Sequence, residues 1–380
     1  MDKSLLNGLV KASKNPHAGN IAVCDVYKIP YYIDTGNYML NLLISGDIYK
    51  GIPAGMIVQW AGTNSTGKSF MTMNTILHHI KSDPNNVALV IETEGALVRD
   101  QILPHLTEDE IPRFLVFPCV TVEDVKNSTN GLLQDIMLKR EVYKDTKFLV
   151  TIDSIGMPPS TKEKTEATTQ DAPKDMTRAQ AIASLLRTVV MELAILHIPT
   201  NVINHQVKSM SQWEPKTETG GEKVGYSNSM TLILNKKKLK NEKKVQVGTV
   251  FNITLKKNRV VAEGTTIEIY SKFKIGMDKY SGLFEFLKNH DLITSKSNGG
   301  AGGSTITFKD TGEKFDTKDI NKMRPEEFWT KERLDYINDK FKEFYLLERS
   351  KERTVDDILE AEAEENKPPV KKKVPEKKKK

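Results

Sequence analysis

Residues 56–80 read MIVQWAGTNSTGKSFMTMNTILHHI, and this stretch decides the fold class. The apolar run 56–60 predicts a buried strand, and residues 68–80 carry the pattern of a helix. The loop between them has the form Gly-x-x-x-x-Gly-Lys-Ser, in which Gly62 and Gly67 let successive backbone N–H groups turn toward one anion. A strand that leads through such a loop into a helix is typical of phosphate-binding sites. We therefore predict that this loop binds a nucleoside triphosphate.

The side chains of the loop have separate expected roles. Lys68 would reach the β- and γ-phosphates, and the Ser69 hydroxyl would ligate Mg²⁺. The helix that begins near Lys68 would add the positive end of its dipole to the same site. The residues that we expect to contact the nucleotide are Gly62, Thr63, Asn64, Ser65, Thr66, Gly67, Lys68, Ser69 and Phe70.

Three more short apolar runs follow along the chain, VALVIE (87–92), KFLVTID (147–153) and TNVIN (200–204). Helical patterns near 68–81, 123–141 and 175–197 separate the four strand candidates. This alternation predicts an α/β protein with a mostly parallel central sheet covered by helices. After residue 229 the pattern changes to antiparallel strands, with the lysine-rich segment NKKKLKNEKK (235–244) as a solvated hairpin.

The sequence divides into four expected regions. Residues 1–30 form a short N-terminal helix and linker, and residues 31–279 form the ATPase core. Residues 280–350 form a small C-terminal α+β domain, with helices in SGLFEFLKNHDLI and PEEFWTKERLDYINDKFKEFYLLER and a hairpin in TITFKDTGEKFD. Residues 351–380 form a disordered tail, acidic at first and then basic.

Acidic residues stand at the ends of two predicted strands, where open α/β sheets bind their ligands. Asp153 closes KFLVTID and is placed to hold Mg²⁺ opposite the phosphate loop. Glu92 and Glu94 both follow VALVI, and one of them is expected to polarise the water that attacks the γ-phosphate. The spacing alone does not show which of the two glutamates has this role. The fourth strand ends at His205, which is either a γ-phosphate sensor or an ordinary loop histidine.

Two long polar segments, 158–174 and 206–225, follow the third and fourth strands. Each carries equal numbers of basic and acidic residues when the first is extended to Arg178, so neither is a basic patch. Long loops at the ligand edge of such a sheet are nevertheless candidates for a nucleotide-controlled binding surface. Trp213, in the second segment, is a candidate for stacking on nucleic-acid bases.

The net charge of +6 comes from the end of the chain, because residues 367–380 hold eight lysines and one glutamate. The remaining residues carry about −1, so composition does not make the folded body a nucleic-acid-binding protein. The lysine run is either a solvated tail or an electrostatic tether to nucleic acid. No apolar run of membrane-spanning length and no signal-peptide core occurs, and the two cysteines have no metal or redox spacing. We expect a cytoplasmic protein, in the host cell if it is viral.

The chain resembles the RecA-type recombinases, and most of all the UvsX branch of T-even-like bacteriophages. The resemblance runs over some three quarters of the chain, from LVKAS to DKYSGLFEF. It includes ISGDIYKGIPAGMIVQWAGTNSTGKS, IETEGAL, FLVTIDS, KDMTRAQAIASLLR, VINHQV, ETGGEKVGYSNSMTLIL and KKNR. DMTRAQ and INH are specific to the UvsX-like branch, whereas many ATPases share the phosphate loop.

The resemblance implies roles for single residues. Glu94 would be the catalytic base and Asp153 the Mg²⁺-site aspartate. His205 would stand where bacterial RecA proteins sense the γ-phosphate with a glutamine. Lys257 and Arg259 would project into the ATP site of the neighbouring subunit, as arginine fingers do. The two polar segments would line the filament axis and grip DNA; their expected contacts are Lys162, Lys164, Arg178, Lys208, Trp213, Gly220 and Gly221.

The sequence departs from the family in two places. Bacterial RecA proteins stack a tyrosine on adenine, and the aligned position here is about Gln101. The tail of UvsX is acidic, whereas this chain ends in lysines.

The resemblance implies an ATP-dependent DNA recombinase that uses ATP and Mg²⁺. It would form helical filaments on single-stranded DNA, with residues 1–30 contacting the next subunit, and exchange strands with duplex DNA. Its further partners would be mediator and single-strand-binding proteins. The alternatives are a hexameric helicase with the same ATPase fold and a single-strand coating protein whose ATP site only regulates assembly.

Overall fold

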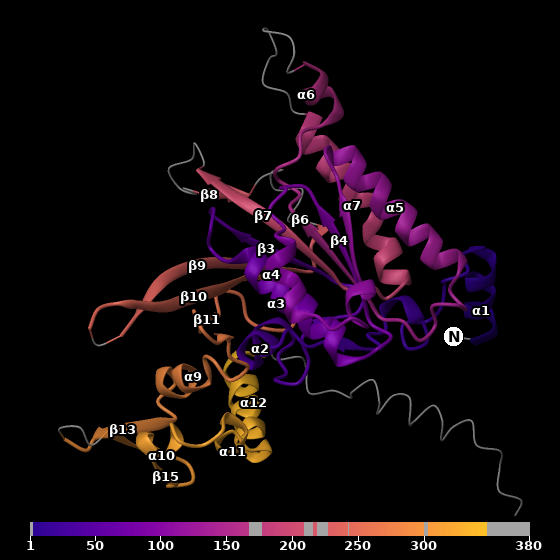
Figure 1. The fold of residues 1–380 in the computed structure, drawn as a ribbon. Coiled ribbons are helices and arrows are strands. Elements are labelled where there is room, and N and C mark those ends of the chain that lie inside the picture. The colour runs from indigo at the N-terminus through magenta and orange to yellow at the C-terminus, as the bar shows by residue number, and fades with distance from the viewer. Residues whose placement is uncertain are drawn as a thin grey trace, which may run out of the picture. The chain divides into compact units, whose positions relative to one another are not determined.

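A computed structural model describes residues 3–166, 177–208, 216–218, 227–241, 243–299 and 303–347 (Figure 1). The chain divides into two units, one made of residues 29–347 and the other of the two terminal segments 1–28 and 348–380. Within the terminal unit the N-terminal segment forms helix α1 (Lys3–Ala12) and the 3₁₀ turn η1 (Asp25–Tyr27). The helix carries exposed leucines at positions 5, 6 and 9.

The larger unit is built on a ten-stranded sheet whose main path runs β12-β11-β10-β9-β3-β7-β6-β4-β5. Six neighbouring strands are parallel, which confirms the predicted sheet: β3 (Ile57–Gly62), β4 (Val87–Glu92), β5 (Phe114–Pro118), β6 (Phe148–Asp153), β7 (Thr200–Lys208) and β9 (Met230–Lys240). The antiparallel strands are β8 (Lys216–Glu218), which pairs with β7, and β10 (Gln246–Lys257), β11 (Thr266–Lys272) and β12 (Gly276–Met277).

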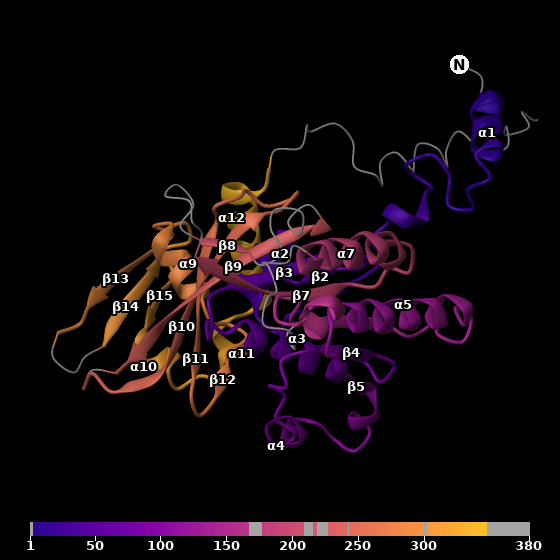
Figure 2. The same ribbon diagram turned by 90° about the horizontal axis from the view of Figure 1, so that it is seen from above.

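Helices cover both faces of this sheet, because its central strands are apolar on both sides; all six residues of β3 are buried. On one face α2 (Tyr38–Ser45) and α3 (Lys68–Ser82) pack in a core that includes Trp60. On the other face α5 (Val122–Leu138) and α7 (Thr177–Ile195) lie side by side over a second core that includes Ile91 (Figure 2). Short elements complete the unit: β1 (Tyr32–Ile33), β2 (Ile52–Pro53), α4 (Arg99–Ile102), η2 (Leu103–His105), η3 (Ile111–Arg113) and α6 (Thr161–Glu166).

The C-terminal part of the larger unit is a small α+β layer. Strands β13 (Ile293–Ser297), β14 (Ser304–Phe308) and β15 (Lys314–Asp316) form an antiparallel sheet. Helices α9 (Leu283–Asn289), α10 (Thr317–Ile320), α11 (Pro325–Phe328) and α12 (Lys331–Tyr345) pack around it. Its aromatic side chains, among them Phe286 and Phe341, belong to the same apolar cluster as Trp60 of β3. This layer therefore continues the core of the ten-stranded sheet.

Several elements of the structure were not predicted, among them helix α2 and the short strands β1, β2, β8 and β12. Strand β5 was not predicted; it lies at the edge of the sheet, where Leu115 and Val116 are each 41% exposed. Strand β13 also was not predicted. The segment expected as one long helix, beginning at Pro325, is two helices, because the chain leaves helical geometry at Trp329 and Thr330.

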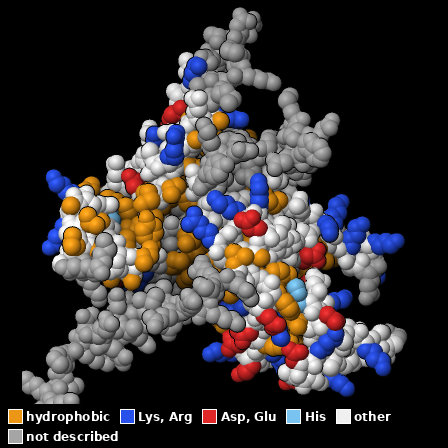
Figure 3. All heavy atoms as spheres, turned by 180° about the vertical axis from the view of Figure 1, so that it is seen from behind, with side chains coloured by type: hydrophobic (Ala, Val, Ile, Leu, Met, Phe, Trp, Pro, Cys, Tyr) orange, Lys and Arg blue, Asp and Glu red, His pale blue; other side chains and the backbone are white. Residues whose placement is uncertain are grey.

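The predicted lysine-rich hairpin is present and is longer than expected. Strands β9 and β10 continue as a two-stranded ribbon well beyond the end of β3 (Figure 1). Basic side chains gather on this projecting part, at the right of Figure 3. The exposed lysines described there are Lys236, Lys237, Lys238, Lys240, Lys243 and Lys244.

Candidate nucleotide-binding site

The phosphate loop joins the end of β3 to the start of α3, and both of its glycines are structurally required. Gly67 has φ +99°, in the left-handed region that favours glycine. A Cβ added at Gly62 would lie 2.6 Å from Thr66 Oγ1 and 2.7 Å from the carbonyl oxygen of Leu234. Neither site leaves room for a side chain. The loop is therefore shaped by backbone geometry, as a cradle of N–H groups must be.

Lys68 folds back over this loop. Its side chain is buried, and Nζ donates to the carbonyl oxygens of Gly62 (3.2 Å) and Thr63 (3.0 Å). Burial lowers the pKa of Lys68, while the nearby carboxylates of Glu94 and Asp153 act in the opposite direction. The negatively charged oxygens of a triphosphate would satisfy this ammonium better than two carbonyl oxygens do. The remaining loop residues differ in exposure: Asn64 and Ser65 are exposed, whereas Thr66 is buried.

Asp153 ends β6 and faces the start of α3. Burial raises the pKa of its carboxyl to about 6, and a hydrogen bond from Ser69 acts against that rise. Its Oδ1 is buried and accepts no hydrogen bond from any residue that the structure describes. A buried carboxylate oxygen without a donor, next to a serine hydroxyl, fits a Mg²⁺ ligand pair. Among the described residues, no three His, Cys, Asp or Glu side chains are arranged so that they could hold a metal ion by themselves.

The two glutamates after β4 have different surroundings. Glu92 is 8% exposed, and its Oε1 accepts hydrogen bonds from the backbone N–H groups of Glu94 (2.9 Å) and Ala96 (3.1 Å). It therefore holds the turn that follows the strand. Glu94 Oε1 instead lies 2.7 Å from Nε2 of His205, and this contact is the largest cause that lowers the pKa of Glu94.

His205 reaches Glu94 because of the strand order. It is paired in register with Gly62 on the adjacent strand β3, so it stands beside the first glycine of the phosphate loop. It also lines a cavity of about 630 Å³, which opens at the carboxyl ends of the parallel strands. The cavity is lined by Thr63, Asn64, Gly156, Met157, Arg178, His205 and Gln206. Loop residues, the histidine and one predicted DNA-contacting arginine thus share one cavity.

Lys257 and Arg259 lie away from this loop. Lys257 ends β10 and donates from Nζ to the carbonyl oxygen of Asn228 (2.7 Å), while Arg259 is exposed. Burial lowers the pKa of Lys257, and the adjacent positive charge of Arg259 adds to this. Phe251, on the same strand, contacts the loop at Gly67. The six residue steps from Phe251 to Lys257 span roughly 20 Å of extended chain.

The other expected contacts are scattered. Gln101 is exposed on α4, and Lys162 and Lys164 are exposed on α6. Lys208 ends β7. Trp213, Gly220 and Gly221 lie outside the described residues.

The sequence did not predict that Phe251 contacts the phosphate loop. Phe251 is 5% exposed, its ring fills the space beside Gly67, and it stacks on Phe70 with 5.6 Å between ring centroids. The alternating pattern of VFNITL predicts that Phe251 points inward. It gives no sign that the ring lies against the phosphate loop.

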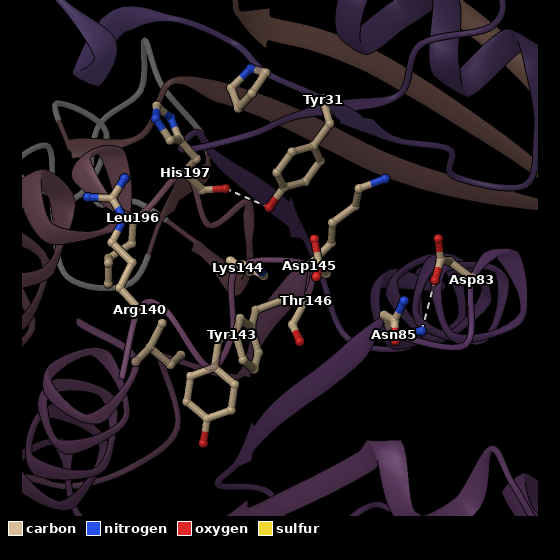
Figure 4. A pocket seen from close by; sticks show the side chains of 14 residues that line it. Tyr31, Asp83, Asn85, Arg140, Tyr143, Lys144, Asp145, Thr146, Leu196 and His197 are labelled. Carbon is tan, nitrogen blue, oxygen red and sulfur yellow. Dashed lines mark hydrogen bonds between the residues drawn. The ribbon is translucent and has the colours of Figure 1, made fainter. Parts of the chain in front are cut away.

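A second cavity, of about 590 Å³, lies near the opposite ends of the parallel strands (Figure 4). It is lined by residues that precede β4, β6 and β7, among them Asp83, Lys147 and His197. The Tyr31 hydroxyl points across it and donates to the carbonyl oxygen of His197 (2.7 Å). None of the phosphate-loop residues lines this cavity.

A phosphate loop between β3 and α3, with acidic residues at the ends of neighbouring parallel strands, defines a P-loop nucleotide-binding protein.

No model of a known protein family matches the chain. The chain is 26% identical over 295 residues to the recombination and repair protein of Enterobacteria phage T4, covering 78% of this chain and 73% of that one. It is 24% identical to the RecA protein of Thermotoga neapolitana over 266 residues, 70% of this chain and 71% of that one. It is also 24% identical to the RecA protein of Nitratiruptor sp. over 281 residues, 73% of this chain and 75% of that one. The chain is thus a relative of the RecA-type recombinases, with affinity to the phage branch.

Proposed function

We propose that this protein is an ATP-dependent DNA recombinase that acts in recombination and repair, in the cytoplasm of the cell that holds the DNA. The observation that carries the proposal is that the side chains of Lys68, Glu94 and Asp153 lie close together. They meet at the carboxyl-end edge of the sheet, where His205 of β7 contacts Glu94. The RecA and phage relatives support the reaction class. No helix within the described ranges is long and apolar enough to cross a membrane.

Each residue of the site would have a separate role in ATP hydrolysis. The loop amides and Lys68 bind the phosphates, and Ser69 and Asp153 would hold Mg²⁺, which neutralises charge on the phosphate oxygens when bound. Glu94 accepts the proton of the attacking water, because its carboxyl is kept ionised by the contact with His205. Glu92 is occupied with two backbone N–H groups, so Glu94 is the better base.

His205 would be the residue that senses whether the γ-phosphate is present. A γ-phosphate beside the loop would give this imidazole a second negatively charged neighbour, so ATP binding and hydrolysis would change its surroundings while its contact with Glu94 remains. The polar segment 206–225 continues directly from His205, and Arg178 lines the same cavity. We propose that these parts bind single-stranded DNA in the ATP state, with Lys162, Lys164, Lys208, Trp213, Gly220 and Gly221 as further contacts.

Lys257 and Arg259 would complete the ATP site of a neighbouring subunit in a helical filament. Their separation from the loop of their own chain supports action in trans. Such a filament would pair single-stranded DNA with a homologous duplex and exchange strands. Mediator and single-strand-binding proteins would then act as partners in loading.

A mixing experiment tests this proposal. Lys68→Ala should abolish ATP hydrolysis while leaving the fold intact, and Lys257→Ala/Arg259→Ala should do the same. In randomly mixed filaments of the two variants about one quarter of the interfaces combine an intact loop with intact cations, so about a quarter of the DNA-stimulated ATPase rate should return. No recovery, with mixed assembly confirmed by energy transfer between differently labelled variants, would refute action in trans. Near-normal ATPase of Lys68→Ala alone would refute the nucleotide site.

A further inference from the structure

An aromatic pair stands beside the phosphate loop without a role in the chemistry described above. Phe70 follows Ser69 in the first turn of α3 and is 40% exposed. One face of its ring is stacked on Phe251, with planes 14° apart and ring centroids separated by 5.6 Å. Phe70 is thus supported by a second ring and is still partly exposed, beside the phosphate loop.

The inner ring of the pair is fixed in place. Phe251 is 5% exposed and fills the space that a Cβ at Gly67 would need. It belongs to β10, which pairs with β9 on one side and β11 on the other. Phe70 therefore rests on a backing that is held by the sheet, and its orientation costs little rotational freedom when a ligand arrives.

A nucleotide held by the phosphate loop would extend its base toward this pair. Lys68 defines the β- and γ-phosphate end of the loop, and the N–H groups of the first turn of α3 come next along the phosphate chain. The ribose and base extend from there past the side chain that follows Ser69. Gln101, which we expected from the sequence to lie near the base, is an exposed amide on α4 and offers no aromatic face.

We propose that Phe70 is the stacking platform for the nucleobase of the bound nucleoside triphosphate, and that Phe251 is the positioning residue that holds it. The inference rests on the proposed nucleotide site and adds its base-binding residue. Every base has an aromatic face, so a platform of this kind binds adenine and guanine alike and does not read their hydrogen-bonding edges. Discrimination between ATP and GTP does not arise at Phe70.

The test compares ATP, GTP and inorganic tripolyphosphate, each with Mg²⁺, by calorimetric titration of the full-length protein. Phe70→Ala should weaken ATP and GTP about tenfold, which corresponds to about 1.4 kcal/mol, within the range of base–aromatic stacking. Its affinity for tripolyphosphate should be unchanged, because that ligand has no base. Phe70→Leu keeps the apolar contact with Phe251 but removes the aromatic face, and should weaken ATP nearly as much.

A matched control and a spectroscopic variant complete the test. Phe344 is 41% exposed and also stacks on a neighbouring ring, that of His290, so Phe344→Ala should leave all three affinities unchanged. Phe70→Trp should retain ATP affinity and show tryptophan quenching with ATP, relative to wild type, but not with tripolyphosphate.

Three outcomes would overturn the inference. Equal weakening of ATP and tripolyphosphate in Phe70→Ala would mean that the ring only supports the loop. Unchanged ATP affinity would place the base elsewhere, and unchanged affinity with smaller assemblies would make Phe70 a subunit contact. Failure of the nucleotide site itself is distinguishable, because the wild type would then bind neither ATP nor tripolyphosphate and Lys68→Ala would have no effect.

Discussion

The carboxyl of Asp153 allows a test whose magnitude follows from the structure. Burial raises its pKa from 3.8 to about 6. A group with a raised pKa in the folded state contributes stability below its unfolded pKa, and that contribution is lost as the pH rises through the folded value. A rise of about two pH units corresponds to about 3 kcal/mol of unfolding free energy lost by pH 8. Asp153→Asn removes this loss.

The assay is thermal unfolding of the full-length protein between pH 4 and pH 8, without nucleotide or Mg²⁺. Wild type and Asp153→Asn should differ least near pH 4, where the carboxyl is neutral in the folded protein and only partly ionised in the unfolded chain. At pH 8 the variant should be more stable by about 3 kcal/mol, or about 4 °C for a folded body of this size. Asp109→Asn, the same substitution at an exposed position, should change little at any pH.

Mg²⁺ and ATP supply the second arm of this test. They should stabilise the wild type by mass action and stabilise Asp153→Asn much less, since the amide is a poor Mg²⁺ ligand. The variant would then be the more stable protein without ligand and the less responsive one with it. A variant that is less stable than wild type at pH 8, or a difference that does not change between pH 4 and pH 8, would refute the reasoning.

Three further predictions concern turnover and DNA. Glu94→Gln should bind ATP but hydrolyse it about 100-fold more slowly, whereas Glu92→Gln should chiefly lower the unfolding temperature by weakening the turn; the reverse pattern in ATPase assays would exchange their roles. His205→Ala should raise the pKa of Glu94 and shift the acidic limb of the ATPase pH profile to higher pH, and an unmoved limb would separate the two residues. Deletion of residues 367–380 should flatten the dependence of log DNA affinity on log salt, and an unchanged slope between about 50 and 300 mM would exclude direct phosphate contacts by the tail.

The sequence predicted the centre of the fold well because two local patterns coincide there. A buried strand, a glycine-bounded loop and a helix follow one another without interruption from residue 56 to 80, so no distant contact is needed to recognise them. The acids at strand ends were predictable for a related reason. Carboxyl ends of parallel strands meet at one edge, so Asp153 and Glu94 had to lie near the loop once the sheet was assigned.

Strand β5 could not be predicted from the same pattern. It is an edge strand, half exposed and only five residues long, and its last residue is Pro118. Its apolar side chains therefore do not give the continuous buried run of an inner strand. Spacing left the choice between Glu92 and Glu94 open for another reason, and only the resemblance implied Glu94. Side chains two residues apart point to the same face of an extended chain, and only the hydrogen bonds of Glu92 to the following turn separate the pair.

The sequence pattern predicts that Phe251 is buried, but it does not predict which residues the ring contacts. Alternation along β10 assigns its ring to the buried face, but the partner it meets depends on the order in which strands are added beyond β3. Because β9 is inserted between β3 and β10, and both strands continue past the end of β3, the ring reaches over the loop to Gly67. The requirement for glycine at position 67 therefore has two causes: a left-handed φ, which the loop motif predicts, and a neighbouring ring from β10, which it does not. Substitution of Phe251 by alanine would remove only the second cause, so the backbone strain of any side chain at position 67 would persist.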